Sequence, residues 1–111
     1  MATALNVFKT VTGVISTTNS VVYTAPTGYT GIILMAQITN ITGTAATITM
    51  THFDGVSTET ELLKSFAVPG NDTASGLTGK LVIQTGHSLK LVASANSTFK
   101  LVLSIVESAN E

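Results

Sequence analysis

The stretch "YTAPTGYTGIILMAQITN", residues 23–40, decides the fold class. Its run from Ile32 to Ala36 is apolar at every position, as in a strand that is covered on both faces. Ahead of the run, Pro26 fixes φ at the first corner of a turn, and Gly28 supplies the positive φ that a type II turn needs. The threonines and Asn40 mark where the strand leaves the core. The stretch therefore predicts a central strand that is entered through a tight turn.

Apolar and polar residues alternate with a period of two on both sides of this stretch, which is typical of strands with one buried face. In "FKLVLSIVE", Phe99, Leu101, Leu103 and Ile105 share one face, and the opposite face is half apolar through Val102 and Val106. Clusters of turn residues separate such runs at the spacing of a sandwich or barrel. The sequence predicts about eight strands, near residues 3–16, 20–25, 30–41, 46–54, 59–68, 79–85, 87–94 and 98–107.

These patterns predict an all-β protein, an antiparallel β-sandwich of jelly-roll type. At 111 residues the chain is expected to form a single domain, 1–111, in which residues 1–9 are a candidate N-terminal arm. An alternative concerns "STETELLKSF", where Thr58 and Glu61 match a helix capping box. That segment is short and runs into Pro69, so a strand is preferred over a helix.

The composition favours assembly over chemistry. Charged residues make up 10% of the chain and apolar residues 44%; there are twenty threonines, no arginine and a net charge of -1. So few charges do little to oppose association. Five scattered lysines argue against nucleic acid or an anionic membrane as partner, no apolar run is long enough to span a membrane, and no signal peptide is apparent. Without cysteine, a disulfide framework and a thiolate metal site are excluded.

The cluster of His52, Asp54, Glu59 and Glu61 is the strongest candidate for chemistry, either as a metal site or as an acid–base pair. The preferred interpretation is structural: Asp54 makes a turn and the glutamates guard an edge strand. His87 is expected to be a surface residue. We predict no catalytic, cofactor-binding or metal-binding residues, and therefore no enzyme.

Two tyrosines flank the "TAPTG" turn. Tyr23 and Tyr29 could offer an aromatic platform for a sugar, but tyrosine is also common where sheets or subunits meet. The second interpretation is preferred, because a glycan-binding site usually needs more exposed aromatic residues than this chain has.

The order of motifs resembles a group of small virion structural proteins of tailed bacteriophages. The similarity is carried by "VVYTAPTGYTGIILMAQITNITGTAATITMT", "LLKSFAVPGND" and "GKLVIQTGHSLKLVASANSTFKLVLSIVE", and it spans about residues 21–107. In that group a "YTAPAG-T" turn opens a strand with an "ITN"-like end, and the chain closes with an "LSI-E" strand. This chain differs at "TGHS", where the group often has an acidic residue after the glycine.

The resemblance implies a β-sandwich subunit located in the virion, assembled in the host cytoplasm, and most simply a capsid decoration or cement protein. Further copies of the chain, as a trimer or symmetric array, are expected as partners from the low charge, the threonine-rich faces and the half-apolar second face. The resemblance adds a major capsid protein or another virion protein as partner. Alternatives are a structural component of the neck, tail or baseplate, and a host-glycan-binding module on the virion.

Overall fold

A computed structural model describes residues 6–75, 77 and 79–110. All the regular structure in this part of the chain is strand, and it holds no helix that could cross a membrane. The bounds of the strands are β1 Asn6–Ile15, β2 Ser20–Thr24, β3 Tyr29–Asn40, β4 Ala46–Phe53, β5 Glu59–Val68, β6 Thr73–Ser75, β7 Leu81–Ile83, β8 Ser88–Ala93 and β9 Phe99–Ala109.

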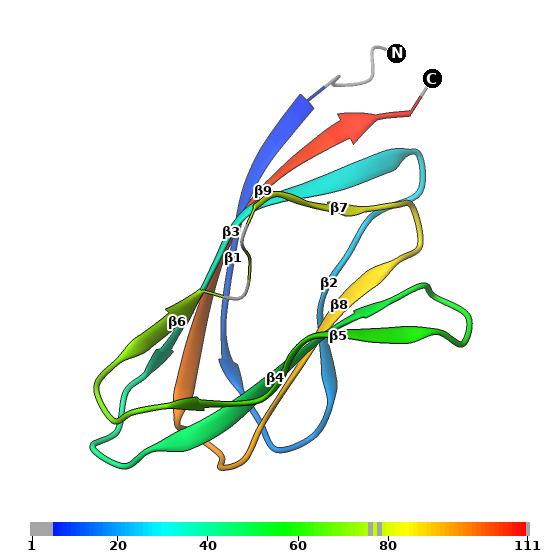
Figure 1. Ribbon diagram of the computed structural model, residues 1–111. Helices are drawn as coiled ribbons and strands as arrows, with labels where there is room; N and C mark the ends of the chain where they lie inside the picture. The colour runs from blue at the N-terminus through cyan, green and yellow to red at the C-terminus, as the bar shows by residue number, and fades with distance from the viewer. Residues whose placement is uncertain (1–5, 76, 78, 111) are drawn as a thin grey trace.

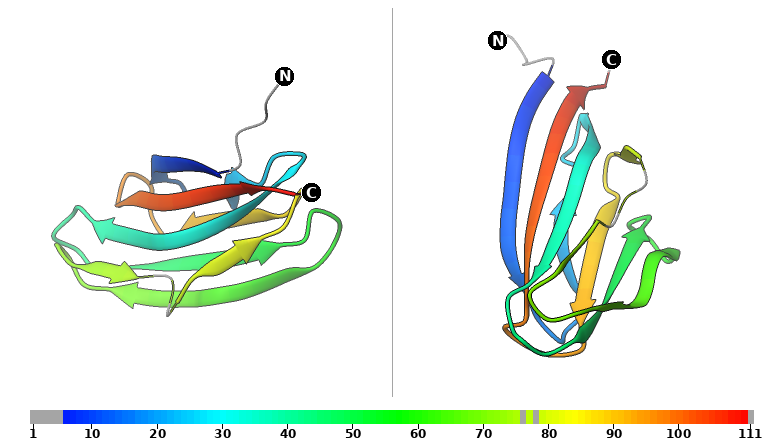
Figure 2. Two further views of the ribbon diagram at one scale, coloured as in Figure 1. Left: turned by 90° about the horizontal axis from the view of Figure 1, so that it is seen from above. Right: turned by 60° about the vertical axis from the view of Figure 1, so that its left-hand side comes forward.

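The strands form two antiparallel sheets that pack face to face (Figures 1 and 2). Sheet A has the order β1-β9-β3-β6, and β7 also pairs with β3 beside β6; sheet B has the order β2-β8-β4-β5. The molecule is elongated, with extents of 50 × 27 × 22 Å. This architecture confirms the prediction of an all-β protein built as an antiparallel sandwich.

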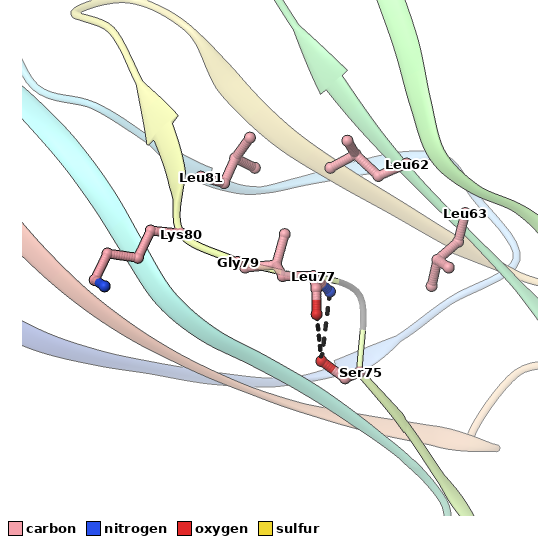
Figure 3. A pocket seen from close by; sticks show the side chains of 7 residues that line it. All are labelled: Leu62, Leu63, Ser75, Leu77, Gly79, Lys80 and Leu81. Atoms are coloured by element: carbon pink, nitrogen blue, oxygen red, sulfur yellow. Dashed lines mark hydrogen bonds between the residues drawn. The ribbon is translucent and has the colours of Figure 1, made fainter.

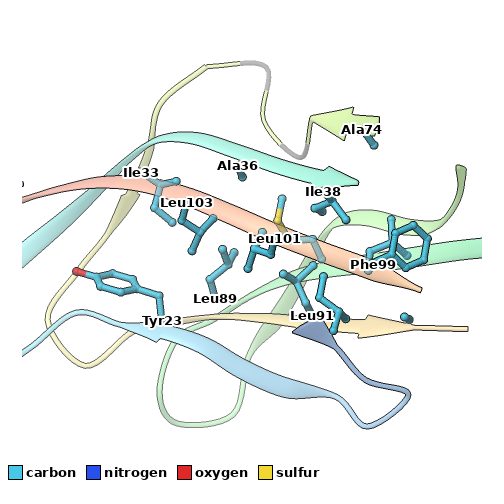
Figure 4. Close-up of a cluster of buried hydrophobic side chains, with 14 of the residues drawn as sticks. Tyr23, Ile33, Ala36, Ile38, Ala74, Leu89, Leu91, Phe99, Leu101 and Leu103 are labelled. Carbon is cyan, nitrogen blue, oxygen red and sulfur yellow. The ribbon is translucent and has the colours of Figure 1, made fainter. Parts of the chain in front are cut away.

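The core lies between the sheets and follows the predicted alternation. In β9 the side chains of Phe99, Leu101, Leu103 and Ile105 are all at most 2% exposed. Of these, Leu101 and Leu103 point toward Leu89 and Leu91 of β8 in sheet B (Figure 4). From the apolar run of β3, Ile33 and Ala36 join the same core, and Ile38 follows beyond the run, so the opening stretch does form the predicted central strand. The prediction that the run is covered on both faces is wrong, because Leu34 is 41% and Met35 37% exposed on the side away from the core.

The turn ahead of β3 was predicted correctly at its glycine and wrongly at its proline. Gly28 has a φ of 86°, and the N–H of Tyr29 donates to the carbonyl of Pro26 at 3.0 Å. Pro26 is therefore the residue that opens the turn rather than its first corner. The φ of proline still suits this place, because the chain arrives there extended.

The predicted number of strands needs correction. The described residues contain nine strands rather than about eight; the additional strand, β6, lies in a segment that sequence analysis treated as turn, residues 69–76. It exists because Thr73, Ala74 and Ser75 pair with β3, a contact that local composition does not reveal. The preferred strand at residues 59–68 is confirmed over the alternative helix at residues 57–66, since β5 pairs along β4 in that region.

The proposed N-terminal arm falls only partly within the structure. Met1 to Leu5 lie outside the described residues, whereas Asn6 to Lys9 form the beginning of β1 and pair with β9.

Asn40, the last residue of β3, closes one end of the sandwich. Its side chain is fully buried; Nδ2 donates to the carbonyls of Thr44 at 2.9 Å and Val68 at 3.2 Å. Its Oδ1 accepts from the backbone N–H of Thr42 at 2.9 Å and from the Thr42 hydroxyl at 2.8 Å. One amide thus holds the β3–β4 loop against the end of β5, which explains why the strand ends in asparagine.

We expect Asn40→Asp to lower the free energy of unfolding by about 2–4 kcal/mol, because two buried carbonyls lose their donor and face a carboxylate. Chemical denaturation monitored by circular dichroism measures this change. The matched control is Asn71→Asp, at an exposed position in the β5–β6 loop, where we expect a change within about 0.5 kcal/mol. Equal effects of the two substitutions would contradict the role assigned to Asn40.

Candidate assembly surface

One candidate surface is the outer face of sheet A, which is turned away from the core. Paired residues of antiparallel strands point to the same face, so the pairing with β9 assigns residues of the other strands to it. The outer face of sheet A comprises Asn6, Phe8, Thr10, Thr12 and Val14 of β1, Lys100, Val102, Ser104, Val106 and Ser108 of β9, Thr30, Ile32, Met35, Gln37 and Thr39 of β3, Thr73 and Ser75 of β6, and Val82 of β7.

Four apolar residues form a continuous row across this face. Phe8 pairs with Val106, Val106 with Ile32, and Ile32 with Val82, so the row crosses four adjacent strands. Its two ends are the most open, with Phe8 77% and Val82 52% exposed. Contiguous exposed apolar area of this kind is typical of interaction sites.

The outer faces of the two sheets differ in charge. Among the residues that the pairing places on the outer face of sheet A, Lys100 alone carries a charge. On sheet B, Lys90 binds Glu59 at 2.8 Å and lies 4.2 Å from the centre of the Phe53 ring. Glu61 of β5 is in register with Lys90 of β8 across Thr51 of β4. Sheet A therefore offers the less hydrated of the two faces.

A hollow opens at the side of the sandwich, between β5 and the segment that joins β6 to β7 (Figure 3). Its volume is about 250 Å³, below the usual range for ligand pockets. Four leucines dominate its lining, and Lys80 is its one charged residue. The lining residues are Leu62, Leu63, Ser75, Leu77, Gly79, Lys80 and Leu81. Without a carboxylate or imidazole in this lining, the hollow offers contact area rather than acid–base chemistry.

The candidate cluster for chemistry is divided by the fold. Asp54 accepts hydrogen bonds from three backbone N–H groups of the β4–β5 turn, which lower its pKa to about 2. Glu59 instead points to Lys90. Glu61 lies exposed on the edge strand β5. Within the described residues, no three histidine or acidic side chains gather as they would around a metal ion.

The structure does bring His52 and His87 together, which sequence analysis did not anticipate. His52 Nε2 lies 3.2 Å from His87 Nδ1, so one ring donates a hydrogen bond to the other. His52 ends the inner side of β4, and His87 lies in the turn between β7 and β8. The pair thus joins the β4–β5 hairpin of sheet B to the β7–β8 turn, one of the connections between the two sheets.

A second grouping missed from the sequence centres on Glu107. Although Glu107 is an acidic residue, it is only 3% exposed and lies among core residues at the end of β9. The Tyr23 hydroxyl donates to its Oε2 at 2.7 Å, and Lys9 Nζ lies 3.3 Å from the same oxygen. Tyr23 belongs to sheet B and Glu107 to sheet A, so this bond ties the sheets together. Because Tyr23 is only 7% exposed, it cannot form the aromatic platform for a sugar considered with Tyr29.

Gly31 makes room for the Tyr23 ring. It pairs directly with Glu107 on β9, and a Cβ atom at this position would lie 2.8 Å from Cε2 of Tyr23 and closer still to the hydroxyl. A larger residue would displace the ring. Gly31 of the opening stretch is therefore explained by Tyr23, eight residues before it.

Tyr23→Phe removes the donor to Glu107, and we expect it to cost about 1–3 kcal/mol of unfolding free energy because a buried acceptor loses its partner. Lys9→Met should cost less, because Lys9 is 46% exposed and exposed ion pairs contribute little. Urea denaturation of both variants provides the comparison. A larger loss in the lysine variant would contradict this ranking.

The same tyrosine predicts a pH dependence. Burial raises the pKa of the Tyr23 phenol above its ordinary value of 10.0, and the hydrogen bond and charge of Glu107 raise it further. The folded chain thus holds this proton more tightly than the unfolded chain. The associated stability is complete below pH 10 and is lost as the pH rises above it. We expect the difference in melting temperature between wild type and Tyr23→Phe to shrink above pH 10.

The histidine pair predicts the opposite trend in acid. Burial lowers the pKa of His52 below 6.5, and the charge of His87 lowers it further, while Asp54 opposes the shift. The unfolded chain binds a proton on His52 more tightly than the folded chain does. The stability that neutral His52 contributes is therefore present above pH 6.5 and is lost as the pH falls below it. We expect His52→Gln to lose less melting temperature than wild type between neutral and mildly acidic pH. An identical loss in both proteins would contradict this assignment.

Comparison with protein-family models finds no match, and no curated protein matches the chain. Similar solved structures do exist. A chain of the Bacillus endospore appendages, which form disulfide-linked pili, has a TM-score of 0.58 and 11% identity, with 96% of this chain and 88% of that chain covered. This likeness shows a shared fold, although the present chain has no cysteine for such links.

Two structures of a pentameric capsid protein isolated from metagenomic phage sequences are also similar. The first has a TM-score of 0.45 at 14% identity, with 89% of this chain and 61% of that chain covered. The second has a TM-score of 0.44 at 14% identity, with 89% and 60% covered. The present chain thus spans about three-fifths of the length of these capsid chains.

Proposed function

We propose that this protein is a structural subunit of a bacteriophage virion and acts as a capsid decoration or cement protein. The observation that carries the proposal is the apolar row on the outer face of sheet A, set among uncharged hydroxyl groups. The sequence resemblance to virion proteins of tailed phages supports it. In this role the protein binds a major capsid protein and further copies of itself, and it has no catalytic residue or cofactor.

The proposed contact is apolar. Burial of apolar area contributes about 25 cal/mol per Å² before the cost of association is subtracted, so a modest contact is weak alone. Repetition of the contact over a symmetric shell strengthens it through multivalency. An ion-pair network cannot take its place, because among the described residues that the pairing places on this face none is acidic and Lys100 alone is charged. Binding should consequently change little with salt, since screening acts on exposed charges.

The strand order also supports assignment to the jelly-roll type. Both β6 and β7 pair with β3, at its end and its beginning respectively, so they share one strand position. Sheet A then has four positions and sheet B four, as in an eight-stranded jelly roll, which is common in viral capsid proteins. A subunit of the neck, tail or baseplate could use the same outer face. The position of the protein in an electron cryomicroscopy map of the particle distinguishes these sites.

We expect Val82→Lys and Val102→Lys to weaken binding to undecorated particles at least about tenfold each, because each buries a lysine where a valine contributes about 1.5 kcal/mol. Sedimentation of the protein with particles, at low and high salt, measures the affinity. The matched control is Val56→Lys, which changes a valine that is 84% exposed in the β4–β5 turn of the other sheet. Equal loss in the control, or affinity that collapses at high salt, would refute the apolar contact.

A further inference from the structure

The edge of sheet A formed by β1 is long and open. β1 pairs with β9 over all ten residues without a bulge, and the described residues place no strand on its other side (Figure 2, right). It contains no proline, and its one charged side chain, Lys9, is directed to Glu107. An edge of this kind presents unpaired backbone donors and acceptors to another strand.

The other edges lack these properties. β5 carries Glu59, Glu61 and Lys64, its pairing shifts register twice, and Ser65 has a positive φ of 47°. β2 has five residues and a bulge, and β6 and β7 have three residues each. Charges, bulges and short length are the usual protections of an edge strand. Among the described strands, β1 is therefore the long edge without protection.

Beyond Asn6, the outward residues of β1 form a pattern that is symmetric in residue class. They run Phe8, Thr10, Thr12, Val14, so that an apolar residue lies at each end and two threonines lie between them, symmetric about Val11. Phe8 is 77% and Val14 is 61% exposed. Two antiparallel copies centred on Val11 would place Phe8 beside Val14 of the partner and threonine beside threonine. Aromatic–aliphatic and Thr–Thr neighbours are favourable cross-strand pairs.

We propose that β1 pairs with β1 of a second copy in antiparallel register about a twofold axis at Val11. The inward side of the strand is compatible with this register. Lys9 would lie opposite Gly13 of the second copy, so two like charges never meet, and Val7 would lie opposite Ile15. A second copy is favoured over an unrelated strand because the complementarity is with the strand itself, as a twofold interface requires.

This pairing joins the two A sheets into one continuous sheet and doubles the number of strands whose outer faces lie side by side. It rests on the proposed role as an assembly subunit, but it concerns the edge of sheet A rather than its face. It also replaces the trimer expected from the composition with a twofold contact as the first step of assembly.

Cysteine cross-linking tests the register directly, since the chain has no cysteine of its own. In the proposed pair the two copies of Val11 lie opposite each other, within reach of a disulfide. We expect Val11→Cys to form a covalent dimer under mild oxidation and Thr60→Cys, on the protected edge β5, to stay monomeric. An equimolar mixture of Thr10→Cys and Thr12→Cys should form the mixed dimer in preference to either like pair, which tests the register at exposed positions should the Val11 variant fold poorly.

A second experiment separates the edge from the outer face. Thr10→Lys with Thr12→Lys gathers four lysines at the proposed twofold axis, and we expect loss of the dimer in sedimentation velocity. Gln37→Lys with Thr39→Lys, on β3 of the same face, should leave the dimer intact while weakening particle binding. A wild-type monomer at high concentration, or cross-linking of Val11→Cys no greater than that of Thr60→Cys, would overturn the pairing without affecting the proposed contact with the shell.

Discussion

The pairing of β3 with β9 is the constraint on which the rest of the structure depends. These strands are the two longest, and they lie side by side in the middle of sheet A from Tyr29 opposite Ala109 to Asn40 opposite Phe99. Because side chains alternate along a strand, this one register decides which residues form the core and which form the outer face. A slip of one residue would bury Lys100 and Ser104 and expose the leucines between them. Both the apolar row and the position of Glu107 follow from it.

The register is reinforced by a buried polar contact. Glu107 lies opposite Gly31, and only that glycine leaves room for Tyr23 to cross from sheet B and donate to the carboxylate. Lys9 approaches the same oxygen from β1. A slip of one residue would turn this carboxylate to the outer face and leave the buried Tyr23 hydroxyl without its acceptor, which is unfavourable. Three strands from two sheets are thus fixed relative to one another by a single side chain, including the edge strand β1.

The sequence allowed the regular parts of this fold to be predicted, and it did so where the pattern is local. The alternation from Phe99 to Ile105 and the positive φ of Gly28 depend on residues that are neighbours in the chain. β6 was missed because three residues in a segment of turn-forming residues, "PGNDTASG", become a strand only through pairing with β3. Glu107 was missed because its burial depends on Tyr23, eighty-four positions away. Val102 and Val106 did signal a half-apolar second face. The row was not visible, because Phe8, Ile32 and Val82 meet only in the folded register.

The distribution of charge suggests how a protein with so few charges can remain in solution and still assemble in one way. Its ion pair on the outer face of sheet B and the glutamates of β5 lie on one side of the molecule, where they oppose association. The outer face of sheet A and the edge of β1 have no such protection, so the proposed assembly uses them for association. Face and edge are perpendicular: contact through one leaves the other free. In the proposed assembly, the edge can therefore join subunits side by side while the face binds the surface beneath them, and neither contact has to compete with the other.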